Sequence, residues 1–276
     1  MKFLIKFFKW FAIILVSIIV LMYIFNVDYL LRAVRTIYFK GYTTAFLEDY
    51  KEFPNREIKK GIAQPWAIAS DYNSVPATQN LQNTHKELQT IAYLIIKNDS
   101  IWHESYFDGF DKNSKTNSFS MAKSVVTMAM GKAIMEGKMK SLDQKVTDFF
   151  PELKGKYAKE VTIGDLSSMA SGLSWDEKYY SPFSIVTRAY FDDNLKDVIL
   201  GLDIKEKPGQ SFKYLSGATQ LLAMCIEKAT GEYLSDYVSK HFWQPMGAEN
   251  EALWQLDEAP DGIEKAYCCI ASNARD

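Results

Sequence analysis

The stretch NSFSMAKSVVTMAMGKAIMEGK, residues 117–138, places a serine and a lysine three residues apart at the start of an apolar run. Its apolar residues recur at nearly helical spacing, and Asn117 or Ser118 can cap the predicted helix. We therefore expect Ser120 and Lys123 in the first turn of a helix that is apolar enough to lie centrally in the fold.

A serine at a helix start can act as a nucleophile, because the unpaired backbone N–H groups there can bind a developing oxyanion. A lysine three residues later faces the same way and can accept the serine proton if its pKa falls below the usual value of about 10.4. An isolated Ser-x-x-Lys is more often an ordinary helix start with a solvated lysine. Ser120 and Lys123 form the single such pattern in the chain, and an apolar helix favours a desolvated amine. The pair is thus a predicted nucleophile and base.

A third group must protonate the leaving group, and a tyrosine can do this if nearby cations lower its pKa. The pattern Tyr-x-Ser begins at Tyr72, Tyr179, Tyr214, Tyr233 and Tyr237, so the pattern alone selects none of them. Tyr214 differs in context, because it follows KPGQSFK in a loop just before a helix predicted at 217–229. Tyr233 and Tyr237 lie in a second predicted helix, 233–242, and are interpreted as packing residues.

The composition is that of a globular protein without a nucleic-acid partner. The 276 residues are 47% hydrophobic, and 32 Lys and Arg against 34 Asp and Glu leave a formal charge of -2, which offers no basic surface for nucleic acid. Cys225, Cys268 and Cys269 match no zinc pattern and are too few for a disulfide framework, so we interpret them as packing residues. With three scattered histidines as well, we expect neither a metal nor a cofactor.

The N-terminal segment has the composition of a membrane helix. Lys2, Lys6 and Lys9 precede an uncharged stretch at 10–25, and the whole apolar length approaches the roughly 20 residues needed to cross a bilayer. A cleaved signal peptide is the alternative, but no small-x-small cleavage site follows, which favours an uncleaved anchor at 1–27. The basic residues before the span predict a single pass through a bacterial-type cytoplasmic membrane, with the rest of the chain extracytoplasmic (periplasmic).

The rest of the chain divides into two parts by pattern. Residues 28–87 are rich in turn formers and charge and are interpreted as a stalk or lead-in. Residues 88–276 form the predicted functional domain, which opens with two β-rich runs, 88–97 and 101–107, that we expect to pair as a hairpin. Further on, 161–175 has the pattern of a short helix that ends in a glycine turn.

Four segments in order resemble one family. SMAK at 120–123 is similar to its Ser-x-x-Lys, VTIGDLSSMASGLSW at 161–175 to its Ile-Thr-x-x-Asp-Leu-Leu-x-x-Thr-Ser-Gly-Leu signature, and PGQSFKYLSGATQLL at 208–222 to its Pro-Gly-x-x-Phe-x-Tyr-Ser segment. EKAYCCIASNARD at 264–276 resembles a stretch of one branch. The family is that of the serine β-lactamase-like hydrolases, in the branch of class C β-lactamases, esterases and 6-aminohexanoate-dimer hydrolases.

The resemblance implies an α+β fold of the β-lactamase/DD-transpeptidase type, with an antiparallel sheet and a helical subdomain, here preceded by the transmembrane helix. It also implies an acyl-enzyme mechanism on a small-molecule or peptide amide or ester. Ser120 would be the nucleophile, Lys123 its base or hydrogen-bond partner, and Tyr214 the general acid and base. Ser216, a substrate-binding residue by this resemblance, stands where many members have asparagine.

The sequence also departs from the family pattern. Members continue into strands that carry a Lys-Thr-Gly or related triad, and KATG at 228–231 ends a predicted helix and is no substitute. We therefore expect the domain to be incomplete at its C-terminus. Two further functions stay open on this basis: a non-hydrolytic penicillin-binding or sensor-type module, and an inactive truncated relative. An unrelated Ser-His-Asp hydrolase is disfavoured, because no Gly-x-Ser-x-Gly occurs.

Overall fold

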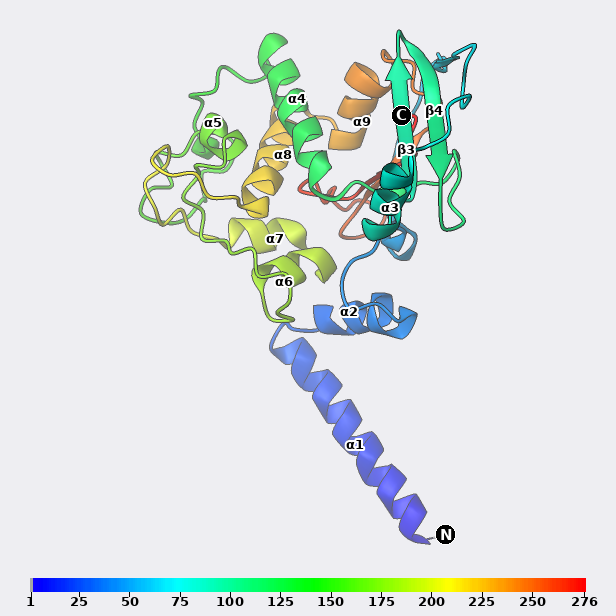
Figure 1. The fold of residues 1–276 in the computed structure, drawn as a ribbon. Helices are drawn as coiled ribbons and strands as arrows, with labels where there is room; N and C mark the ends of the chain where they lie inside the picture. The colour runs from blue at the N-terminus through cyan, green and yellow to red at the C-terminus, as the bar shows by residue number, and fades with distance from the viewer. Residues whose placement is uncertain (1) are drawn as a thin grey trace.

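The structure, a computed structural model, describes residues 2–276 and begins with a helix that stands apart from the body. Helix α1 (Lys2–Ile24) buries none of its residues and projects away from the rest of the chain (Figure 1). By length and composition α1 could cross a membrane, a test that a signal sequence also passes. Met1, the first residue of the predicted anchor 1–27, lies outside the described residues.

The body mixes helices and strands. Its α-helices are α2 (Tyr29–Thr36), α3 (Gln79–Glu87), α4 (Ala122–Met135), α5 (Ile163–Ser167), α6 (Ile185–Phe191), α7 (Leu195–Leu200), α8 (Ser216–Thr230) and α9 (Leu234–Val238). Short 3-10 helices are η1 (Tyr38–Lys40), η2 (Asp49–Glu52), η3 (Phe119–Met121) and η4 (Val146–Asp148), and η5 (Ser239–Trp243) is a short π-helix. The strands are β1 (Asn55–Ile58), β2 (Ala67–Ile68), β3 (Ala92–Lys97), β4 (Ser100–Tyr106), β5 (Thr116–Asn117), β6 (Ala252–Gln255) and β7 (Ile270–Ser272).

The strands of residues 2–276 form two small sheets. One has the order β1-β6-β7-β5 with every pair antiparallel, and the other has the order β2-β4-β3. The expected hairpin is β3–β4, whose turn residues Asn98 and Asp99 both have positive φ, as tight hairpin turns require. The pair β2–β4 is parallel, so the sheet content is not wholly antiparallel.

The main core lies where α4 packs against α8. Val126, Ala129 and Ala133 of α4 are fully buried, and α8 is buried from Ser216 to Ile226. Small side chains on α4 let the two helix axes approach closely. Figure 1 shows α4 and α8 among the helices on one side of the molecule, with the β3–β4 hairpin on the other. The helices predicted at 217–229 and 233–242 correspond to α8 and to α9 followed by η5.

Residues 28–87 differ from the expected stalk. Tyr29, Ala33 and Ile37 belong to the main core, since α2 carries its apolar residues at helical spacing on one face. Further along, Ile58 is fully buried and β1 pairs with β6. Because β1 is an edge strand of the four-stranded sheet, this segment completes the fold and does not merely lead into it.

Candidate active site

Ser120 and Lys123 are brought together at the start of α4. Lys123 Nζ donates to Ser120 Oγ at 3.0 Å. The Ser120 residue is exposed, whereas Lys123 is 8% exposed. The structure differs from the prediction in one detail, because Ser120 lies in the 3-10 turn η3 and α4 begins two residues later.

The turn that carries Ser120 has an unusual backbone. Phe119 has a φ of 47°, a left-handed conformation that costs a non-glycine residue on the order of 1 kcal/mol or more. The Phe119 amide donates to Asn117 Oδ1 at 2.8 Å, and Asn117 Nδ2 donates in turn to the buried Asp49 at 3.0 Å. The buried Asn117 side chain therefore holds the strained turn through hydrogen bonds, and Ser120 is exposed.

The amine of Lys123 is buried but satisfied. Besides its bond to Ser120, Lys123 Nζ donates to the backbone carbonyl of Tyr267 at 2.6 Å. Burial lowers the pKa of Lys123 from its ordinary value, an effect that the Tyr214 hydroxyl and the Glu177 carboxylate partly oppose. Because the net change is a lowered pKa, Lys123 is neutral more often in this site than a lysine in water, and a neutral amine can accept a proton.

Tyr214 also lies close to the lysine. Its ring centroid is 5.0 Å from Lys123 Nζ, and the side chain remains 41% exposed. The loop before α8 is fixed by the backbone of Met169, whose φ is 59° and whose carbonyl accepts from the Lys213 amide at 2.7 Å. The structure thus gathers Ser120, Lys123 and Tyr214, the three predicted catalytic residues, from η3, α4 and this loop.

Ser216, the fourth predicted site residue, is the first residue of α8 and is buried. Its backbone N–H and its hydroxyl both donate to the carboxylate of Glu177, the hydroxyl at 3.3 Å. The carboxylate also accepts from Trp175 Nε1 at 2.9 Å. Glu177 was missed by sequence reasoning, although it stands in an irregular aromatic segment that has the composition of a pocket lining.

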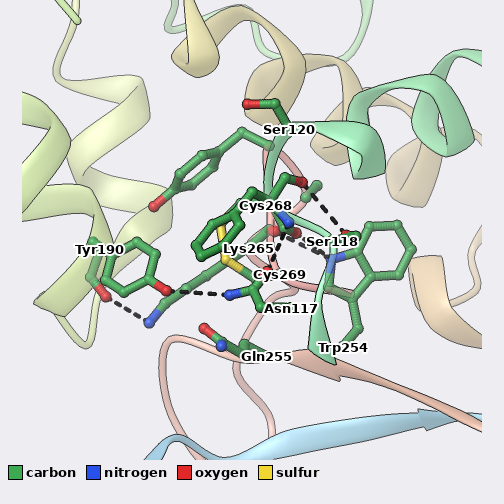
Figure 2. The surroundings of a disulfide bond; sticks show 12 residues. Asn117, Ser118, Ser120, Tyr190, Trp254, Gln255, Lys265, Cys268 and Cys269 are labelled. Atoms are coloured by element: carbon green, nitrogen blue, oxygen red, sulfur yellow. Dashed lines mark hydrogen bonds between the residues drawn. A yellow bond between two sulfur atoms is a disulfide. The ribbon is translucent and has the colours of Figure 1, made fainter. Parts of the chain in front are cut away.

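A disulfide follows directly after Tyr267, whose carbonyl accepts from Lys123 (Figure 2). Cys268 and Cys269, neighbours in sequence, are bonded to each other, which differs from their interpretation as separate packing residues. The Cys268 carbonyl accepts from Trp254 Nε1 at 3.0 Å, so the segment that presents the Tyr267 carbonyl is anchored in the core. The remaining cysteine, Cys225, is free and buried, as expected.

A cavity of about 580 Å³ opens beside this cluster. Ser120, Lys123 and Ser216 lie in its wall, and it extends from them toward α2 and α6. Its volume is in the range that holds small organic ligands. Among residues 2–276 no group of His, Cys, Asp and Glu side chains is arranged to hold a metal ion.

Comparison with known proteins places this geometry in a family context. The family model for beta-lactamase matches residues 77–267, a segment that includes all four predicted site residues. Over 207 residues, 71% of this chain and 52% of the relative, the sequence is 25% identical to 6-aminohexanoate-dimer hydrolase of Paenarthrobacter ureafaciens. It is 24% identical over 189 residues to protein flp of Staphylococcus aureus strain MW2, covering 64% of this chain and 37% of that protein.

Solved structures agree on the fold. A Bacillus anthracis protein assigned provisionally as a 6-aminohexanoate-dimer hydrolase has a TM-score of 0.65 at 23% identity, over 82% of this chain and 64% of that one. A penicillin-binding protein of Bacillus halodurans has a TM-score of 0.57 at 16% identity, over 70% of each chain. The chain spans about half the length of the first curated relative. The beta-lactamase/penicillin-binding-protein fold is therefore confirmed, and, because the family match covers well over half of its residues, the chain belongs to the beta-lactamase family.

Proposed function

We propose that this chain is a membrane-anchored serine hydrolase that cleaves an amide or ester through an acyl-enzyme on Ser120. The observation that carries the proposal is the 3.0 Å contact between Lys123 Nζ and Ser120 Oγ, made by an amine that is buried and has a lowered pKa. Membership of the beta-lactamase family supports the same chemistry, and a relative named as a 6-aminohexanoate-dimer hydrolase supports an amide among the substrates.

In the acylation step, neutral Lys123 removes the proton of the Ser120 hydroxyl while Oγ attacks the substrate carbonyl carbon. The carbonyl oxygen takes up the electron pair, and the backbone N–H of Ser120 would help to stabilise the resulting oxyanion. The bond to the leaving group then breaks as the electron pair returns to form the carbonyl. A proton passes to the leaving nitrogen or oxygen, and the products are an ester on Ser120 and a free amine or alcohol.

Tyr214 would relay that proton. Its ring centroid lies 5.0 Å from Lys123 Nζ, and the residue is 41% exposed, which supports this role. In deacylation the same groups would take a proton from an attacking water, which hydrolyses the ester and regenerates Ser120. Ser216 would act at the cavity wall as a substrate contact, with its direction set by Glu177.

The placement in the cell rests on α1. This helix is long and apolar enough to cross a membrane and none of its residues is buried, so burying its side chains in hydrocarbon is the simplest way to remove them from water. The lysines near its start favour an inside N-terminus, which would put the hydrolase on the periplasmic side of a bacterial-type membrane. A signal peptide is the alternative, and intact mass of the protein from membranes distinguishes the two.

The proposed function is tested by labelling the full chain, in detergent, with a fluorophosphonate probe and recording intact mass. The wild-type protein should gain one adduct, and Ser120→Ala should gain none. Ser124→Ala, which removes an exposed serine in the first turn of α4, is the matched control and should label like the wild type. Folded protein that does not label would refute the proposal.

The same preparation decides between hydrolysis and binding alone. Turnover of nitrocefin or of a simple ester, lost in Ser120→Ala, supports the hydrolase. A stable adduct with a fluorescent penicillin that persists without any turnover would instead assign the chain to the non-hydrolytic binding modules.

A further inference from the structure

Most residues that line the cavity beside Ser120 belong neither to the serine–lysine pair nor to its immediate neighbours. From the serine it runs between α2 and the segment that leads into α6. Ala33 and Val34 of α2, and Ile37 directly after it, line one part of the cavity, and Phe183 and Val186 line another. These apolar residues do not close the space by packing together, so the cavity stays open to a ligand.

The lining is almost free of charge. Among the described residues that line the cavity, Lys123 alone is charged. Several of the lining hydroxyls are already engaged, since Tyr190 donates to Asp49 and Thr187 Oγ1 donates to the Ser181 carbonyl at 2.8 Å. Three hydroxyl-bearing residues, Tyr38, Thr43 and Thr44, also line the cavity, but most of its surface is apolar. A substrate with repeated amide groups along its length would lose hydrogen bonds to water against that apolar surface, which is costly. An alkyl chain loses none.

The far end of the cavity lies close to the membrane helix. Helix α2 begins at Tyr29, only a short turn after α1 ends at Ile24. Figure 1 shows α2 and α6 at the end of the body from which α1 departs. Two apolar residues at this end of the cavity are exposed on the surface of the protein, Val34 at 39% and Phe183 at 73%. An exposed apolar surface beside a membrane helix is suited to contact with lipid.

We propose that this site is built for a long-chain acyl ester or amide, with the acyl chain of about eight or more carbons lying between α2 and α6 and its carbonyl at Ser120. The inference rests on the proposed function, because it names the substrate class of the same serine. The acyl chain enters from the membrane side, where α2 follows α1. The cavity volume of about 580 Å³ accommodates such a chain together with the head of the substrate.

The test is a chain-length series of p-nitrophenyl esters, hydrolysed by the full chain in detergent micelles. Each fully buried methylene is worth about a fourfold gain in kcat/KM. Allowing for partial burial, octanoate should exceed butyrate at least tenfold. Val34→Trp places an indole in the cavity and should lower octanoate hydrolysis about tenfold while butyrate hydrolysis stays within twofold.

The matched control is Arg35→Trp, which adds the same ring to α2 at an exposed residue that does not line this cavity. It should leave both rates unchanged and thereby exclude a general effect of tryptophan on micelle binding. Circular dichroism on both variants confirms folding, and the butyrate rate serves as an internal check of an intact serine.

The outcomes separate the two proposals. Equal rates for butyrate and octanoate, both lost in Ser120→Ala, would overturn the acyl-chain inference and leave the hydrolase in place. A length preference that Val34→Trp and Arg35→Trp reduce equally would also overturn it, because the preference would then arise in the micelle. Absence of both hydrolysis and fluorophosphonate labelling would overturn the proposed function and this inference with it.

Discussion

Replacing Lys265 with methionine should remove the increase in the free energy of unfolding that this lysine produces as the pH rises above 7. Lys265 is completely buried, and its Nζ donates to the Tyr190 carbonyl at 2.6 Å (Figure 2). The same Nζ lies 3.8 Å from the centre of the Phe53 ring. Burial, and after it the charge of Arg32, lower the pKa of Lys265 from 10.5 to about 7. The nearby carboxylates of Asp49, Asp192 and Asp257 oppose this change without reversing it.

The sign and size of the effect follow from proton binding. Between pH 7 and 10.5 the unfolded chain holds a proton on this lysine that the folded chain has released. The contribution of Lys265 to the free energy of unfolding therefore rises with pH across that window, by about 1.4 kcal/mol for each pH unit. The pKa falls from 10.5 to about 7, a difference of about 3.5, so the whole contribution is on the order of 5 kcal/mol.

Methionine keeps an unbranched side chain of similar length but binds no proton. The measurement is urea unfolding of wild type and Lys265→Met, followed by tryptophan fluorescence in detergent from pH 6 to 9.5. The unfolding free energy of the wild type minus that of the variant should climb by about 3 kcal/mol over this range. Lys196→Met, at an exposed lysine, is the control and should give a flat difference. A flat difference for Lys265→Met as well would refute the reasoning.

Three other predictions concern the site and its support. The rate at which a fluorophosphonate labels Ser120 should rise with pH to a plateau reached below pH 10.5, because burial lowers the pKa of Lys123, and Lys123→Arg should label at least 100-fold more slowly. Gly217→Ala should destabilise the fold by about 1–3 kcal/mol in thermal unfolding, because the new Cβ would lie 2.5 Å from a tryptophan ring, whereas Gly131→Ala, with open space around it, should not. Burial, and after it a neighbouring carboxylate, raise the pKa of Glu227 from 4.5 to about 9, so the contribution of this carboxyl to stability falls as pH rises through that window; the Tm of Glu227→Gln relative to wild type should therefore be higher at pH 8 than at pH 5.

Local patterns predicted the elements that carry the site. The helix after Ser120, the hairpin at β3–β4 and helix α8 all follow from periodicity and turn residues that lie close together in sequence. The pairing of Ser120 with Lys123 also depends on short spacing, since residues three apart on a helix are neighbours. Their catalytic roles, and those of Tyr214 and Ser216, stay predictions that the labelling experiments test.

Contacts between distant segments could not be predicted in this way. The Tyr267 carbonyl that holds Lys123 is 144 residues further along the chain, and no pattern around Tyr267 indicates it. Glu177 meets Ser216 across 39 residues. Turn formers and charge in residues 28–87 indicate a stalk, and an eight-residue helix such as α2 gives no clear signal until the core that it packs against is known.

The two hydrogen bonds of Lys123 explain why its backbone partner matters for the chemistry. A carbonyl can only accept a hydrogen bond, so the Tyr267 oxygen must be met by an N–H of the amine. A hydroxyl can donate or accept, so Ser120 is free to donate once the amine is neutral. With one N–H committed to the carbonyl, rotation of the amine is restricted and its lone pair can be directed at the serine proton. No side-chain substitution at Tyr267 removes that oxygen, and the positioning of the base is therefore a property of the backbone that the Cys268–Cys269 segment supports.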